Sequence, residues 1–110
     1  MADRHNLVVI LSDQQRYDTM ACYGNDWIHV PHLNGLASES LVFDNCYVTQ
    51  PVCCPSRASI MCGQYPIDAG MPVNRHILPQ HLPTIAEMLS DEYHTGYVGK
   101  WHVGQKRTPL

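Results

Sequence analysis

The sequence predicts an α/β fold, and three observations support this prediction. Residues 7–11 form a continuous apolar run rich in β-branched side chains, which is typical of a strand buried on both faces of a parallel sheet. Extended and helical patterns then alternate as strand, helix, strand, helix, strand. The 110 residues are 45% hydrophobic, within the range of globular domains.

The charge content narrows the class of protein. Only 15% of the residues are charged, against a usual ~25%, which indicates a piece of a larger protein rather than a free small domain. Seven basic and ten acidic residues give a net charge of −3, which excludes nucleic-acid binding driven by bulk charge.

No apolar run approaches the ~20 residues of a membrane span. Residues 1–6 are polar and show no secretory signal, so a cytoplasmic location is expected.

Proline and glycine mark the first two predicted helices. Pro31 suits a first helical turn because its ring fixes φ near the helical value, and apolar residues follow near one face. A second, short helix is predicted over residues 56–62, with Pro55 in its first turn and Gly63 beyond its end.

A capping box marks the third helix. Thr84 and Glu87 match the S/T-x-x-E pattern, in which the two side chains satisfy the first backbone N–H groups, and this helix is expected to end near residue 91. The remaining elements are strands predicted at 41–43 and 95–99 and a loop over 70–83.

The five cysteines do not suit a closed disulfide framework, because their number is odd. Cys22, Cys46 and Cys62 are predicted to be buried small hydrophobes, a common state for free cysteine. Cys53, which directly precedes Cys54 between two prolines, requires another explanation.

Asp13 and Gln14 form the first of three candidate clusters. They follow the first predicted strand, and α/β folds place their active sites at the carboxyl ends of strands. Carboxylate and amide oxygens suit Ca²⁺ or Mg²⁺. The structural alternative is a helix cap at Asp13 and a solvated Gln14.

Cys53 and Arg57 form the second cluster. A cysteine just before a helix N-terminus lies in a positive field that stabilises an anion, and the backbone amides there can hold sulfate or phosphate. Arg57 adds a planar pair of donors. The alternative is a buried cysteine and a surface arginine.

Lys100 and His102 form the third cluster. Residues two apart in an extended segment point to the same side, so an ammonium group and an imidazole could clamp one oxyanion, and the imidazole could move a proton. Trp101 would then face the core. The alternative is a solvated edge.

Two long motifs resemble the signatures of the formylglycine-dependent sulfatase family. Residues 51–63, PVCCPSRASIMCG, are similar to the first signature, C-x-P-S-R with a short helix and glycine. Residues 95–104, TGYVGKWHVG, are similar to the second, which ends G-K-W-H-x-G. The resemblance implies an alkaline-phosphatase-like α/β/α sandwich with a mostly parallel sheet, in which residues 1–110 are an incomplete N-terminal portion of the catalytic domain.

The resemblance also implies a reaction, the hydrolysis of a sulfate monoester. A separate maturing enzyme would oxidise Cys53 to formylglycine, and one hydroxyl of the hydrated aldehyde would attack sulfur. The second hydroxyl would then expel sulfate and restore the aldehyde. The substrate would be a sulfated small molecule or carbohydrate.

The resemblance assigns roles to the remaining candidates. Asp13 and Gln14, with the hydrated residue 53, would hold Ca²⁺ or another divalent metal. Arg57 would stabilise the hydrated aldehyde. Lys100 would bind the sulfate ester, and His102 would contact the nucleophile or the sulfate.

Three positions depart from the family's usual pattern. Gln14 stands where many sulfatases have a second aspartate, Cys54 fills a position that is usually small, and Glu92 replaces a common glycine. Asp13, Gln14 and residue 53 cannot fill the roughly six to eight oxygen positions that Ca²⁺ prefers, so other ligands are required.

Two alternative functions stay open on the sequence. A phosphonate monoester or phosphodiester hydrolase of the same superfamily can share C-x-P-x-R, although G-K-W-H favours sulfate. A non-catalytic fragment or degenerate binding module would keep Cys53 as an unmodified thiol, which intact-mass measurement distinguishes from formylglycine.

We expect residues 1–110 alone to be inactive, because they hold only part of the implied metal ligand set. An assay of this chain on an aryl sulfate in the presence of Ca²⁺ checks the expectation. Robust Ca²⁺-dependent turnover would contradict it.

Overall fold

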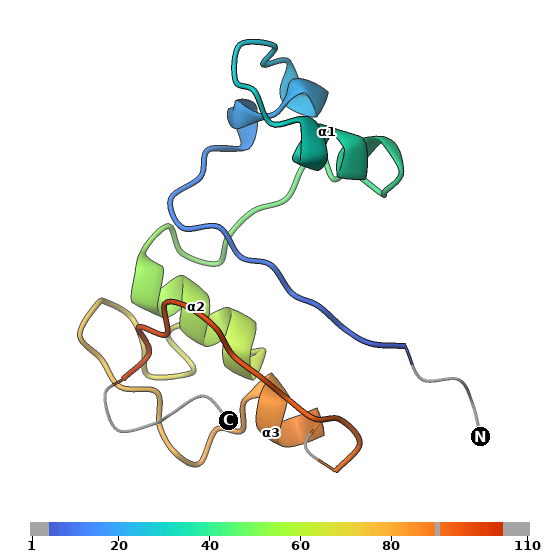
Figure 1. Cartoon of the computed structure of the whole chain (residues 1–110). Coiled ribbons are helices and arrows are strands. Elements are labelled where there is room, and N and C mark those ends of the chain that lie inside the picture. Colours follow the sequence, from blue (N-terminus) through green and yellow to red (C-terminus); the bar gives the residue numbers. More distant parts are fainter. Residues whose placement is uncertain (1–4, 90, 105–110) are drawn as a thin grey trace. The chain divides into compact units, whose positions relative to one another are not determined.

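The computed structural model describes residues 5–89 and 91–104, which divide into two compact units on either side of residue 46. Unit 1 ends at Cys46 and unit 2 begins at Tyr47. The elements in chain order (Figure 1) are the 3-10 turns η1 (Tyr17–Thr19) and η2 (Ala21–Tyr23), followed by the helices α1 (Pro31–Ser38), α2 (Cys53–Cys62) and α3 (Ile85–Leu89). Within these ranges, no helix is long and apolar enough to cross a membrane.

The strands predicted at residues 7–11, 41–43 and 95–99 are not found among the described residues. Residues 7–11 form an extended trace (Figure 1), and their apolar side chains are exposed, Ile10 to 86%. A strand requires backbone hydrogen bonds to a neighbouring strand, and the described residues provide no such neighbour. The predicted sheet is therefore absent from this part of the chain, while the helices are present.

Unit 1 is held by hydrogen bonds that join its turns to α1. Asn34 in α1 accepts a hydrogen bond from the backbone N–H of Ala21 through Oδ1 at 3.1 Å. Asn25 Nδ2 donates to the carbonyl of Asp18 at 2.7 Å. Helix α1 begins at Pro31, as predicted.

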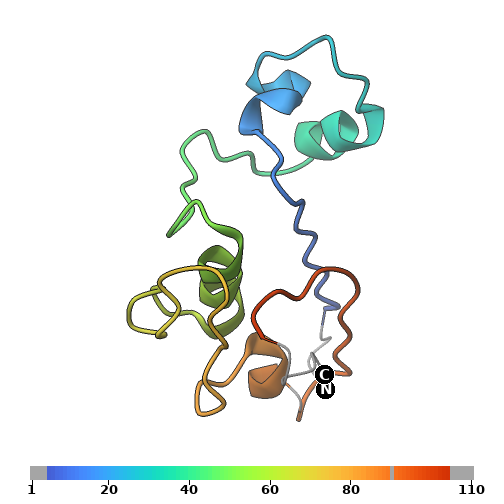
Figure 2. The same ribbon diagram turned by 90° about the vertical axis from the view of Figure 1, so that its left-hand side faces the viewer.

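The buried core of the described residues lies in unit 2. Small side chains on α2 pack against apolar side chains from the loop that follows it and from the segment that carries Trp101. Figure 2 shows this loop curling beside α2 before it reaches α3. The core residues are Cys54, Ala58, Ala69, Met71, Leu78, Leu82 and Val103.

The end of α2 that Gly63 predicted and the start of α3 that the capping box predicted are both confirmed. Gly63, with φ 71°, follows α2 and donates its N–H to the carbonyl of Ser59 at 2.8 Å. The backbone N–H and the hydroxyl of Thr84 donate to Glu87 Oε2 at 2.6 and 2.8 Å. Helix α2 begins at Cys53, earlier than predicted, and α3 spans Ile85–Leu89.

All five cysteines are free thiols, but the prediction of which are buried is wrong for two of them. Cys22 and Cys46 are exposed, whereas Cys54 is buried. Cys62 is half-buried and packs against the core. The physical reason is that the core lies in unit 2, so the two thiols of unit 1 have no apolar cluster to enter.

Gly104 provides a test of the packing in unit 2. Its φ is 135°, and an added Cβ would lie 2.8 Å from Ile77 Cγ2. We expect Gly104→Ala to lower the free energy of unfolding by about 1–3 kcal/mol, measured by denaturant titration.

Gly35→Ala is the matched control for Gly104→Ala. Gly35 lies inside α1, and an added Cβ there would meet no atom within 4 Å. Alanine is the better helix former, so this change should stabilise the protein by about 0.5–1 kcal/mol. Equal effects of the two substitutions would show that Gly104 is not tightly packed.

Candidate functional site

Cys53 is the first residue of α2, whereas the sequence predicted that it lies just before the helix. Val52 caps the helix in an extended conformation, with φ −133° and ψ 135°, and makes no side-chain capping hydrogen bond. Cys53 is half-buried. Its side chain therefore lies at the positive end of the helix dipole, where an anion is stabilised.

Arg57 is buried, with 6% of its surface exposed. Its guanidinium Nη1 donates to the backbone carbonyl of Lys100 at 2.7 Å. The hydrogen bond joins positions 43 residues apart in the sequence, one in each of the two motifs. The alternative prediction of a surface arginine is therefore wrong. The hydrogen bond also brings the helix that contains C-C-P-S-R next to the segment that contains G-K-W-H.

Lys100 and His102 lie on an irregular segment rather than on a strand. The Tyr97 hydroxyl also donates to the Lys100 carbonyl, at 2.5 Å. Both Lys100 and His102 are exposed. Because the φ of His102 is +59°, the regular extended alternation that would place the two side chains on one side is interrupted.

Trp101 packs against the core, as predicted from the sequence. Its ring meets the Tyr97 ring edge-on, with centroids 5.3 Å apart and planes at 84°. This contact holds the indole of the residue that separates Lys100 from His102 in the sequence. The segment is thus anchored by Trp101 and by the fully buried Val103.

Asp13 and Gln14 lie in unit 1, in an exposed bend after the extended trace. Gln14 has a φ of 54°, in the left-handed region. Across residues 5–89 and 91–104, no group of three or more His, Cys, Asp or Glu side chains gathers to hold a metal ion. The two side chains offer suitable oxygen donors, but a complete metal centre is not assembled by the described residues.

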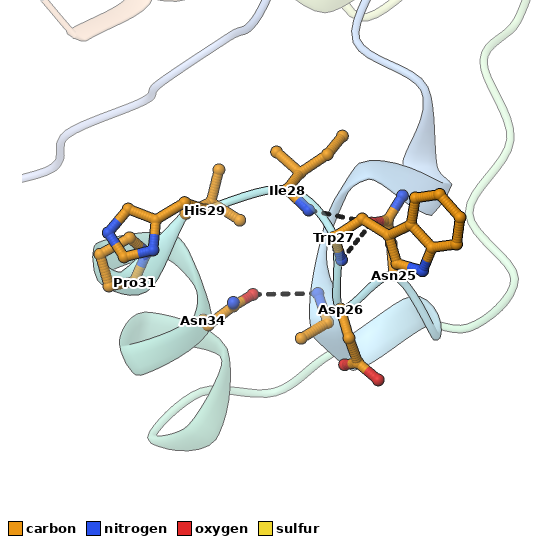
Figure 3. Close-up of a pocket in the computed structure, with 9 residues that line it drawn as sticks. Asn25, Asp26, Trp27, Ile28, His29, Pro31 and Asn34 are labelled. Atoms are coloured by element: carbon orange, nitrogen blue, oxygen red, sulfur yellow. Dashed lines mark hydrogen bonds between the residues drawn. The ribbon is translucent and has the colours of Figure 1, made fainter.

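A cavity in unit 1 is lined by none of the predicted site residues. It has a volume of about 320 Å³ and lies beside the start of α1 (Figure 3). Asn25 Oδ1 organises its rim by accepting the N–H groups of Trp27 and Ile28 at 3.1 and 3.2 Å. The sequence patterns predict no site here.

Sequence reasoning also missed a contact at the start of α2. Asn74 Oδ1 accepts the backbone N–H of Cys54 at 3.1 Å. The signal that could have found it is the N-cap residue Val52, whose side chain cannot accept a hydrogen bond. A helix that begins without its own cap needs an acceptor from elsewhere.

The two adjacent cysteines differ in environment. Cys53 is half-buried, whereas Cys54 has 1% of its surface exposed. Burial raises the pKa of the Cys54 thiol above its ordinary value. The neutral thiol is therefore the form that the folded state favours at Cys54.

Comparison with known proteins identifies the family. Residues 5–108 match the Sulfatase family, and the chain belongs to it. The family implies an alkaline-phosphatase-like α/β fold, and its members generally use formylglycine and a divalent metal. No solved structure matches the chain.

The curated relatives are sulfatases from bacteria and mammals. The chain is 42% identical to an ulvan-active sulfatase of Formosa agariphila over 94% of its length, which is 20% of that relative. It is 39% identical to human arylsulfatase A, with 90% of the chain and 21% of the relative covered. It is 32% identical to an N-acetylglucosamine-6-O-sulfatase of Bacteroides thetaiotaomicron, with 91% and 18% covered. The chain thus spans about a fifth of the length of these relatives.

The environments of the two thiols predict their reactivity. In protein made without the maturing enzyme, Cys53 should react with iodoacetamide faster than Cys54, because the thiolate is the nucleophile and Cys54 is both buried and of raised pKa. Mass spectrometry of the peptide after timed labelling measures both rates. Exposed Cys22 is the internal control for fast labelling.

Denaturation should remove the difference in labelling rate between Cys53 and Cys54. Native labelling of Cys54 at the rate of Cys22 would contradict its burial.

The raised pKa of the Cys54 thiol also makes the free energy of unfolding depend on pH. The contribution of this thiol to stability is complete below the pKa of the unfolded thiol, near 9.0, and declines as the pH rises above it.

Proposed function

We propose that this chain is the N-terminal portion of the catalytic domain of a sulfatase, an enzyme that hydrolyses sulfuric ester bonds. The observation that carries the proposal is the buried hydrogen bond from Arg57 to the Lys100 carbonyl. It brings the two sulfatase motifs together within unit 2. The family match over residues 5–108 supports the same function.

Cys53 is proposed as the residue that a sulfatase-maturing enzyme converts to formylglycine. When formed and hydrated, this group supplies the hydroxyl nucleophile. The position of Cys53 at the start of α2 supports the assignment, because the helix dipole stabilises negative charge that develops there. Its partial exposure leaves it open to substrate.

Three side chains are proposed to act around Cys53. Arg57, four residues along the same helix, stabilises the hydrated aldehyde through its positive charge. The exposed ammonium group of Lys100 binds the oxygens of the sulfate ester. The exposed imidazole of His102 contacts the nucleophile or the sulfate and can move a proton at a ring nitrogen.

Asp13 and Gln14 are proposed as ligands of a divalent metal, which we take to be Ca²⁺. Their carboxylate and amide oxygens fit a hard cation, and both side chains are exposed. Such a metal, when bound, polarises sulfate oxygens. The hydrated residue 53 is proposed as a third ligand, and water or further protein oxygens would complete the roughly six to eight positions that Ca²⁺ prefers.

A sulfated small molecule or carbohydrate is proposed as the substrate. Two of the relatives carry names that refer to ulvan and to N-acetylglucosamine 6-O-sulfate groups. Lys100 would recognise the sulfate group that all such substrates share. Residues 70–81, which include Arg75 and His76, are proposed to lie near the active face and to contact the substrate.

Adjacent substitutions in the complete protein test the assignment of the nucleophile. Cys53→Ala should abolish hydrolysis of an aryl sulfate, because no formylglycine can form. Cys54→Ala should lower stability by about 1–3 kcal/mol through the cavity it leaves, yet keep turnover per formylglycine.

Mass spectrometry and steady-state kinetics measure these effects. Conversion of Cys53 removes two hydrogens and replaces sulfur by oxygen. Retained activity of Cys53→Ala would refute the proposed function, as would a wild-type protein that carries only the unmodified thiol after production with a competent maturing enzyme. Equal rates on sulfate and phosphate esters would favour the phosphodiesterase-type alternative.

A further inference from the structure

Helix α2 begins without a capping side chain of its own. Its N-cap residue is Val52, which makes no side-chain hydrogen bond to the helix. The first N–H groups of a helix have no partner within it. Pro55 removes one of these donors, because proline has no N–H, and the N–H of Ser56 already donates to the Val52 carbonyl at 3.0 Å.

Asn74 supplies the acceptor that Val52 lacks. Its side-chain Oδ1 accepts the Cys54 N–H at 3.1 Å, from a position 20 residues further along the chain. The same loop holds the Cys54 side chain, because Cys54 Sγ lies 3.7 Å from the carbonyl of His76. Cys54 is therefore held by its backbone and by its thiol.

The loop that carries Asn74 is itself anchored at both ends. The N–H of Met71 donates to the carbonyl of Pro66 at 2.7 Å, and the N–H of Leu78 donates to the carbonyl of Val103 at 2.9 Å. The side chains of Met71 and Leu78 are fully buried. Asn74 thus reaches α2 from a support that is fixed to the core.

A second contact fixes the chain just before α2. Gln50 Nε2 donates to the carbonyl of Pro72 at 2.7 Å. The backbone around Cys53 is consequently tied to the same loop before the cysteine, through Gln50, and after it, through Cys54.

We propose that Asn74 is a positioning residue for the nucleophile derived from Cys53. It acts through the backbone of Cys54, whose N–H it holds, and the inference rests on the proposed function of Cys53. Loss of this hydrogen bond frees the first turn of α2 to shift. A small misplacement of a reacting group costs rate, because attack requires a fixed distance and direction.

Asn74→Leu and Asn74→Asp in the complete protein separate this role from simple packing. Leucine has a similar size but no acceptor, so we expect kcat per formylglycine to fall between about 10- and 100-fold with KM unchanged. Aspartate keeps the acceptor, and its charge suits a helix N-terminus, so we expect near wild-type kcat. Asn74→Ala gives the same comparison should the leucine variant fail to fold.

Asn34→Leu is the matched control. Asn34 Oδ1 also accepts a half-buried backbone N–H at 3.1 Å, that of Ala21 in unit 1. Its loss should lower stability by a similar amount and leave kcat per formylglycine unchanged.

The outcomes distinguish the two proposals. No turnover, or no formylglycine, in the wild-type protein refutes the proposed function. Normal kcat per formylglycine in Asn74→Leu, in an active wild-type background, overturns the role of Asn74 alone. Equal losses in Asn74→Asp and Asn74→Leu also overturn it, because the acceptor oxygen would then be irrelevant.

Discussion

One hydrogen bond, from the buried guanidinium of Arg57 to the backbone carbonyl of Lys100, organises unit 2. A buried charge is costly unless it is hydrogen-bonded, so this hydrogen bond favours the arrangement in which the Lys100 carbonyl lies beside α2. This hydrogen bond therefore helps to hold the helix that begins at Cys53 against the segment that carries His102. The proposed catalytic groups of unit 2 lie at the two ends of this contact.

The Cys53–Cys54 pair divides two tasks between neighbouring residues. Cys54 enters the core and is held by the loop that carries Asn74, while Cys53 stays partly accessible at the helix start. Successive residues in a helix point about 100° apart, so one can pack while the next reacts. The burial of the Cys54 side chain therefore leaves Cys53 accessible.

Local signals in the sequence predicted local structure well. Pro31, Gly63 and the Thr84–Glu87 capping box each marked a helix end through short-range geometry, and all three are confirmed. The sheet was predicted from apolar runs, but a strand depends on a partner that the run itself does not specify. The Arg57 and Asn74 contacts span 43 and 20 residues. Val52 at the N-cap indicates that α2 needs an outside acceptor, but the local pattern does not say which residue supplies it. The candidate site could be named from its motifs, whereas the contacts that hold its parts could not.

The exposed run at residues 7–11 has a consequence for handling the protein. Its five side chains are apolar, three of them β-branched, and it contains neither charge nor proline. Such a segment with an unpaired backbone is a template for intermolecular β-sheet. Asp13, two residues beyond the run, is the nearest charge on its C-terminal side, and charges that flank an apolar strand oppose this assembly. The carboxylate proposed as a metal ligand would then also act as a gatekeeper against aggregation while the chain is unpaired.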